Sequence, residues 1–178
     1  MRLFIAVNFN NETRLRLLAL RDELRSESQR GNFSASENMH LTLVFIGEVS
    51  PKKVDKIKAI MDTVTFAPFT ATIDRLGTFS RGTLWWAGLR EDKPIMVLQH
   101  EVEYKLALGG FEMDGRKYNP HITLGREVVT DVKPWAIEPF GETGGTIDLM
   151  KSERINGKLT YTAIYTRKSS RISTNRED

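Results

Sequence analysis

The chain has 178 residues, 40% of them hydrophobic and 28% charged, which is enough for one compact domain and is neither a disordered nor a fibrous composition. It contains no cysteine, which excludes a disulfide framework, cysteine-bound zinc and thiolate catalysis. The formal net charge of +3 permits a phosphate-bearing partner but is far below the charge density of a dedicated DNA-binding protein.

The amino-terminal apolar run, residues 3–9, is predicted to be a buried strand leading into a helix capped by Asn10 or Asn11. This run is too short for a signal peptide, and no later segment approaches the roughly 18 apolar residues that span a membrane. We therefore expect a cytoplasmic protein that does not bind membranes.

Strand and helix patterns then follow one another along the chain. Helices are predicted where apolar residues recur at helical spacing, at residues 12–30, 51–67 and 94–108. Strands are predicted where β-branched and aromatic residues gather, at residues 40–46, 69–76, 83–89, 121–129, 145–155 and 158–167. Residues 1–167 are interpreted as a single domain, and residues 168–178 as a polar, flexible tail.

A short motif occurs twice in the chain. His-Leu-Thr-Leu at residues 40–43 recurs as His-Ile-Thr-Leu at residues 121–124, and a predicted hairpin follows each copy. The sequence thus predicts an α+β fold of two pseudo-symmetric lobes, each an antiparallel sheet with helices on its outer face, around a central cleft. Such symmetry brings the two motif copies together.

Each motif presents an imidazole and a hydroxyl on one face of its strand. Because side chains alternate along a strand, His40 and Thr42 share a face, as do His121 and Thr123. A single histidine in a strand is more often structural, but here two of only three histidines begin the same pattern. We therefore interpret the pair as functional and the third, His100, as a surface residue.

With these motifs, the sequence resembles the two-histidine phosphoesterases, and among them the RNA 2′,3′-cyclic phosphodiesterases, also described as 2′–5′ RNA ligases. The resemblance rests on residues 2–7, 37–49 and 119–126, and it extends to about residue 167. Residues 130–142 depart from the family pattern, because Pro134 and Pro139 leave little room for a helix that many relatives carry.

The resemblance implies hydrolysis of an RNA or nucleotide 2′,3′-cyclic phosphate to a 2′-phosphomonoester, by a monomer that needs neither a metal nor another cofactor. In that scheme His40 donates a proton to the leaving oxygen, His121 accepts a proton from water, and Thr42 and Thr123 bind the phosphate. Imidazole suits both proton transfers because its unperturbed pKa is about 6.5. The resemblance also implies reversible 2′–5′ RNA ligation, in which a ribose 5′-hydroxyl takes the place of water.

Arg126 is a further candidate for phosphate binding, since its position matches an arginine common after the second motif in this family. Regular alternation, however, points Arg126 away from His121 and Thr123 unless the strand bends or bulges, so an ordinary salt bridge stays open. Candidates for contacts with the base or the backbone of a nucleotide are Phe9, Phe79, Arg81, Trp85, Lys117 and Tyr118.

Other functions stay open at this point. One is a phosphodiesterase for another substrate, such as ADP-ribose 1″,2″-cyclic phosphate. Another is a noncatalytic module that binds RNA or a nucleotide on the same fold. The matched pair of imidazoles argues against the second, because phosphate binding needs hydrogen-bond donors but no acid and base.

Overall fold

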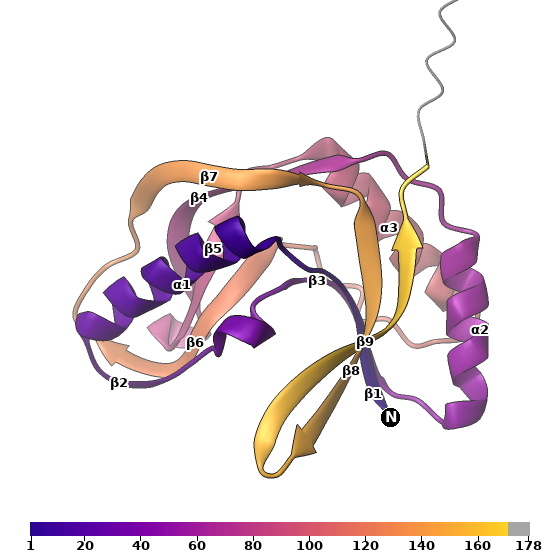
Figure 1. Cartoon of the computed structure of the whole chain (residues 1–178), viewed down its shortest axis with the longest axis horizontal. Helices are drawn as coiled ribbons and strands as arrows, with labels where there is room; N and C mark the ends of the chain where they lie inside the picture. Colours follow the sequence, from indigo (N-terminus) through magenta and orange to yellow (C-terminus); the bar gives the residue numbers. More distant parts are fainter. Residues whose placement is uncertain (171–178) are drawn as a thin grey trace, which may run out of the picture.

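The first strand, β1 (Arg2–Val7), lies inside a four-stranded antiparallel sheet. In the computed structural model, which describes residues 1–170, β1 pairs with β3 (Leu41–Glu48) on one side and β8 (Thr146–Ile155) on the other. Strand β9 (Lys158–Lys168) pairs with β8 and completes the order β3-β1-β8-β9. The β8–β9 hairpin extends past the end of β1 (Figure 1).

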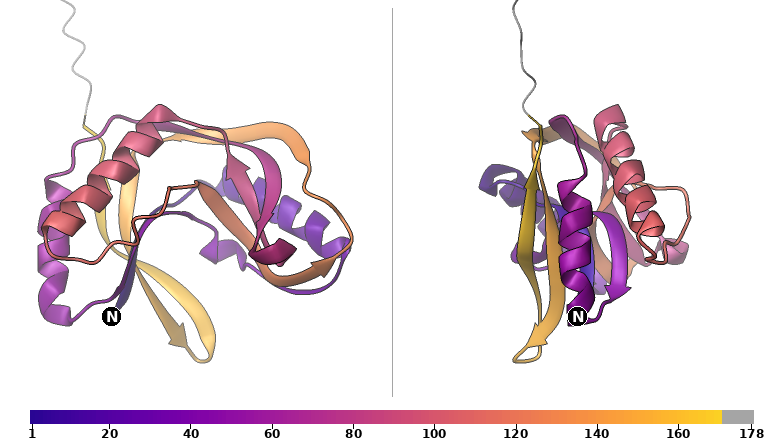
Figure 2. Two further views of the ribbon diagram at one scale, coloured as in Figure 1. Left: turned by 180° about the vertical axis from the view of Figure 1, so that it is seen from behind. Right: turned by 90° about the vertical axis from the view of Figure 1, so that its right-hand side faces the viewer.

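Five strands form a second antiparallel sheet. In sheet order they are β2 (Ser28–Phe33), β6 (His121–Thr130), β5 (Leu84–Leu89), β4 (Phe69–Phe79) and β7 (Ala136–Gly144). Short 3-10 turns lie at η1 (Ser36–Asn38), which precedes β3, and at η2 (Ser80–Gly82), which joins β4 to β5. The two sheets meet at an angle and give the molecule the outline of an arch (Figure 2).

Three α-helices pack against the sheets. Helix α1 (Asn11–Ser26) contacts β2, β6 and β7, and its first turn is capped by Asn10, whose side chain accepts from the Thr13 amide. Helix α2 (Pro51–Asp62) contacts β9 and α3 (Lys93–Leu108), which itself contacts β3 and β4. Two antiparallel sheets with these helices confirm the predicted fold class.

One apolar cluster runs through both sheets. It takes one face of β1, namely Leu3, Ile5 and Val7, and extends to Trp85 in β5 and Leu124 in β6. The opposite face of the four-stranded sheet carries a separate small cluster formed by Phe4, Ala6 and Met150, with Tyr161 packed against it. Phe4 and Tyr161 of this second face line a cleft between the two sheets.

The two lobes are not consecutive halves of the chain. The hairpin that follows the first motif, β4–β5, pairs through β5 with β6, which carries the second motif. The hairpin that follows the second motif, β8–β9, pairs with β1, the neighbour of β3. The four-stranded sheet thus contains the first motif strand, β3, and the hairpin that follows the second motif. The five-stranded sheet contains the second motif strand, β6, and the hairpin that follows the first motif. The two lobes are therefore interleaved along the chain.

The predicted helix over residues 12–30 is wrong in its second half. Helix α1 ends at Ser26, and residues 28–33 form the edge strand β2 on β6. The Ser26 and Ser28 hydroxyls donate to the carbonyl oxygens of Glu23 and Leu24, which ends the helix by satisfying carbonyls of its last turn. After Leu24 the segment has no buried side chain left to hold a helical face on the sheet.

Residues 130–142 contain no helix, in agreement with the prediction from their prolines, and Ala136–Gly144 forms strand β7. Pro139 is tolerated there because β7 is an edge strand.

The predicted tail, residues 168–178, begins at the last residue of β9, Lys168. The backbone amides of Ser169 and Ser170 donate hydrogen bonds to the carbonyl oxygens of Gly145 and Phe66. Residues 171–178 lie outside the described residues. Within residues 1–170, no helix has the length and apolar character to cross a membrane.

Gly77 offers a test of how the five-stranded sheet supports the second motif. A Cβ at Gly77 would lie 2.2 Å from the ring of Trp86, which in turn packs against Phe79 and His121. We expect Gly77→Ala to lower the free energy of unfolding by about 1–3 kcal/mol, because the indole must move. Urea denaturation measures this.

The matched control is Thr70→Ala, an exposed position of the same strand, which should stay within about 0.5 kcal/mol of the wild type. Equal stability of Gly77→Ala and the wild type would show that the Trp86 packing is not as close as described.

Candidate functional site

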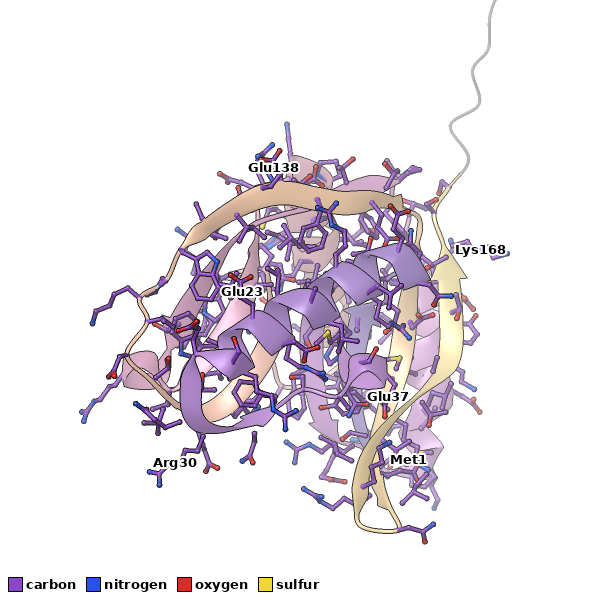
Figure 3. The ribbon with its side chains drawn as sticks, turned by 60° about the vertical axis from the view of Figure 1, so that its left-hand side comes forward. Met1, Glu23, Arg30, Glu37, Glu138 and Lys168 are labelled. Atoms are coloured by element: carbon purple, nitrogen blue, oxygen red, sulfur yellow. The ribbon has the colours of Figure 1, made fainter. Side chains whose placement is uncertain are left out.

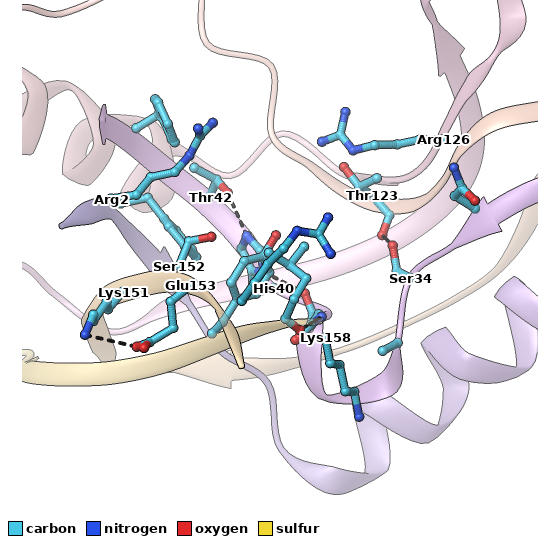
Figure 4. Close-up of a pocket in the computed structure, with 18 of the residues that line it drawn as sticks. Arg2, Ser34, His40, Thr42, Thr123, Arg126, Lys151, Ser152, Glu153 and Lys158 are labelled. Carbon is cyan, nitrogen blue, oxygen red and sulfur yellow. Dashed lines mark hydrogen bonds and ion pairs between the residues drawn. The ribbon is translucent and has the colours of Figure 1, made fainter. Parts of the chain in front are cut away.

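A cleft of about 1250 Å³ lies between the two sheets. Its lining includes His40 and Thr42 from the first motif and His121 and Thr123 from the second, so the structure brings both motifs to one cavity. Arg126 also lines it. Figure 4 shows His40 with Thr42 on one side of the cleft, and Thr123 with Arg126 on the other.

The His40 imidazole is held at both nitrogens. Its Nδ1 lies 2.7 Å from the carbonyl oxygen of Asn38, and its Nε2 lies 2.9 Å from the Thr42 hydroxyl. The ring packs on Phe4, with centroids 4.8 Å apart, and against Tyr161 at 5.2 Å. These contacts fix the ring on the cleft face of the four-stranded sheet.

His121 repeats the Nδ1 anchor and the aromatic packing in the other sheet. Its Nδ1 lies 2.7 Å from the carbonyl oxygen of Asn119, again two residues earlier in the chain. Phe79 meets the ring edge-on at 5.0 Å, and Trp86 lies at 6.3 Å. Each imidazole therefore has one carbonyl anchor and two aromatic neighbours.

The carbonyl anchors determine which nitrogen of each ring is available for chemistry. A carbonyl oxygen only accepts hydrogen bonds, so Nδ1 of His40 and of His121 must carry a hydrogen. In the neutral ring, Nε2 then keeps its lone pair, and in the charged ring it donates a proton. Both rings thus present Nε2 for proton transfer.

Burial lowers the pKa of both imidazoles below its ordinary value, because the charged form loses solvation. The anchors to Asn38 and Asn119 oppose this by stabilising the charged rings, while His121 lowers the pKa of His40 further and Arg126 does the same to His121. A proton on His121 thus disfavours a proton on His40, which is the direction that an acid–base pair requires.

A β-bulge places Arg126 in the cleft. Trp86 and Trp85 of β5 pair with Thr123 and Gly125 of β6, so β6 has one extra residue at this point. Leu124 and Gly125 are both buried as a result, and Arg126 returns to the face of Thr123. Regular alternation, which points Arg126 away, does not apply to this strand.

The first motif has the same bulge. Ala6 and Ile5 of β1 pair with Thr42 and Val44 of β3, which again inserts one residue. The residue five positions after His40 is therefore also turned into the cleft, and it is Phe45, which is 52% exposed. The two halves of the site differ here, with an arginine on one side and an aromatic ring on the other.

The cleft is lined by more cationic than acidic side chains. Lys151 is paired with Glu153 at 3.0 Å, and Lys158 with Glu37 at 2.7 Å. Figure 3 shows Glu37 on η1 beside the β8–β9 hairpin. Three further cations, Arg2, Arg126 and Arg154, line the cleft without a carboxylate partner within residues 1–170. The cleft thus suits an anionic ligand.

None of the six predicted aromatic and basic contact residues lines the cleft. Trp85 and Phe9 belong to the core, and the Tyr118 hydroxyl donates to the Thr42 carbonyl oxygen at 2.8 Å. Phe79 packs edge-on against the His121 ring. Arg81 and Lys117 are not among the lining residues.

The aromatic side chains that do line the cleft are Phe4, Phe33, Phe45 and Tyr161. Sequence reasoning missed them, although a signal existed for one. Phe45 follows His40 at the same offset at which Arg126 follows His121. His100, by contrast, is exposed on α3 as predicted.

Known proteins resemble this chain in sequence and in structure. A sequence model described as "LigT like Phosphoesterase" matches residues 7–86. An RNA 2′,3′-cyclic phosphodiesterase of Archaeoglobus fulgidus is 32% identical over 151 residues, 80% of this chain and 85% of the relative. One of Escherichia coli strain K12 is 30% identical over 167 residues, 92% and 93% of the two chains.

A solved structure, that of E. coli LigT complexed with 3′-AMP, superposes with a TM-score of 0.85 at 26% sequence identity and covers 96% of this chain and 98% of LigT. Sequence and fold therefore agree over nearly the whole length. The chain belongs to the LigT-like two-histidine phosphoesterases, the family of the RNA 2′,3′-cyclic phosphodiesterases.

Proposed function

We propose that this protein hydrolyses the 2′,3′-cyclic phosphate of an RNA end or a nucleotide and leaves a 2′-phosphomonoester. The observation that carries the proposal is the pair of imidazoles anchored at Nδ1, which leaves both Nε2 atoms available for proton transfer in one cationic cleft. Two relatives that cover most of the chain are named RNA 2′,3′-cyclic phosphodiesterases. E. coli LigT has been crystallised with the nucleotide 3′-AMP, which agrees with a nucleotide ligand in this cleft.

In the proposed reaction the two histidines work in opposite protonation states. Neutral His121 takes a proton from water at Nε2, and the resulting hydroxide attacks phosphorus. The bond from phosphorus to the ribose 3′-oxygen breaks, and protonated His40 gives its Nε2 proton to that oxygen. One water is consumed and both protons are accounted for. The reaction leaves His121 protonated and His40 neutral.

The phosphate oxygens need donors as negative charge accumulates on them. The hydroxyls of Thr42 and Thr123 lie on the two sides of the cleft and supply one donor each. Arg126 adds a charged donor on the side of Thr123. The same groups serve reversible 2′–5′ ligation: a ribose 5′-hydroxyl takes the place of water, the bond from phosphorus to the 3′-oxygen breaks as before, and a 2′–5′ phosphodiester forms.

A binding module without activity is a weaker account of this site. Phosphate binding alone is served by Arg126 and the two threonines, and it gives no reason for two imidazoles held in the same tautomer by matching carbonyls. The positioned proton donor and acceptor favour turnover.

The two histidines provide the direct test. We expect His40→Ala and His121→Ala each to lower kcat on an RNA ending in a 2′,3′-cyclic phosphate by about 100-fold or more, because each removes one proton transfer. Analysis of the product end group follows the reaction, and a chelator should leave it unchanged.

The matched control is His100→Ala, which removes the exposed third histidine and should retain full activity. Circular dichroism shows whether each variant is folded. A folded His40→Ala or His121→Ala enzyme with near-wild-type turnover would contradict the proposed mechanism.

The lowered imidazole pKa values predict the pH dependence of the reaction. The acid must be charged and the base neutral, so kcat/KM should follow a bell with its maximum below pH 6.5 and should fall as the pH rises from there. A bound phosphate anion stabilises the charged rings and should shift the bell of kcat to higher pH. A kcat/KM that rises steadily from pH 6 to pH 9 would refute the pairing.

Arg126 should affect both binding and the pH profile. Arg126→Gln removes a phosphate donor, and we expect kcat/KM to fall by about tenfold or more. The loss of this cation also removes one cause of the lowered pKa of His121, so the bell should move to higher pH. A purely structural role for Arg126 would leave the pH profile in place.

A further inference from the structure

Two arginines in the cleft have no part in the proposed reaction. Arg2 and Arg154 line the cleft without a carboxylate partner within the described residues, yet both belong to the four-stranded sheet, across from Arg126. Figure 4 shows Arg2 on the side of β1 and Arg126 on the side of β6. Unpaired cations in a cleft indicate a place for an anion.

Strand pairing places these two arginines on the face that carries His40. Arg2 pairs with Ser152, so their side chains share a face, and Arg154 is two residues further along β8 on that same face. Phe4, which packs on His40, is two residues from Arg2. Two residues along a strand correspond to about 7 Å, so Arg2 lies one such step beyond the residue that touches His40.

Both guanidinium groups are held in position by the protein. The Arg2 guanidinium carbon lies 5.0 Å from the centre of the Phe45 ring. Arg154 donates from Nη1 to the carbonyl oxygen of Gly157 at 3.0 Å, within the β8–β9 hairpin. Each retains further N–H donors for a ligand, and a guanidinium matches phosphate oxygens in geometry as well as charge.

The pseudo-symmetry of the two motifs supports a second anion position. Phe45 follows the first motif at the same offset at which Arg126 follows the second. The cation beside the first motif is instead Arg2 of the neighbouring strand β1, whose guanidinium lies over the Phe45 ring. The volume of the cleft, about 1250 Å³, exceeds the roughly 300–1000 Å³ that encloses a small-molecule ligand. There is room for more than the reacting phosphate and its ribose.

We infer that Arg2 and Arg154, with Phe45 packed under Arg2, bind a second phosphate group, the one attached to the 5′-oxygen of the terminal ribose. The preferred substrate is then an RNA 3′ end, or a cyclic nucleotide with a 5′-phosphate, rather than a nucleotide with a free 5′-hydroxyl. This inference rests on the proposed function and adds the part of the substrate that the cleft recognises away from the reacting centre.

Three substrates test the inference: adenosine 2′,3′-cyclic phosphate with a 5′-hydroxyl, the same nucleotide with a 5′-phosphate, and a diadenosine dinucleotide ending in the cyclic phosphate. We expect the wild-type kcat/KM to be about tenfold or more higher for the two substrates with a 5′-side phosphate. Arg2→Gln and Arg154→Gln should each remove much of this preference, mainly through KM, and added salt should reduce it.

The matched control is Arg30→Gln, an exposed strand arginine that lies away from the β8–β9 hairpin and should keep the wild-type preference (Figure 3). Equal losses on all three substrates in Arg2→Gln and Arg154→Gln would overturn the inference. So would a wild type that does not distinguish the 5′-phosphate from the 5′-hydroxyl. No turnover of any of the three substrates would instead contradict the proposed function itself.

Discussion

His40 and His121 each donate a hydrogen bond from Nδ1 to the carbonyl oxygen of the asparagine two residues earlier, and the geometry of the site follows from this pair of bonds. The anchors turn both Nε2 atoms to the cleft, and they partly offset the cost of charging a buried ring. Phe4 and Tyr161 on one side, and Phe79 and Trp86 on the other, hold the rings against rotation. Each sheet thus supplies one histidine with two aromatic neighbours.

The fold also explains how one motif comes to differ from the other. Both motif strands carry a bulge at the same place, so residues 45 and 126 both enter the cleft. Arg126 stands beside the second motif and Phe45 beside the first, where Arg2 covers the ring. Because each sheet is completed by the hairpin of the other half, the cations of the cleft come from both ends of the chain. The two sides of the cleft therefore differ, with Arg126 on the five-stranded sheet and Arg2 and Arg154 on the four-stranded sheet.

Much of this could be predicted from the sequence, and the failures have physical causes. The motif strands, helix α3 and the Asn156-Gly157 hairpin turn have strong local patterns, and all are observed. Strand β2 was missed because its residues are polar and its partner β6 is about 100 residues away in sequence, so only the tertiary fold shows the pairing. The side on which Arg126 lies stayed open, because regular alternation and a bulge place it on opposite faces and only the strand pairing shows the bulge in β6. The sheet partners of a hairpin are likewise absent from any local pattern, so Arg154 could not be placed in the cleft.

The anchored imidazole pair is tested most directly by nitrogen NMR of the protein labelled with ¹⁵N in its histidines, titrated through neutral pH. The account predicts that His40 and His121, assigned from their single variants, carry the hydrogen on Nδ1 when neutral and titrate below pH 6.5. Neutral rings with the hydrogen on Nε2 would mean that the carbonyl anchors do not form in solution, and would contradict the proposed site.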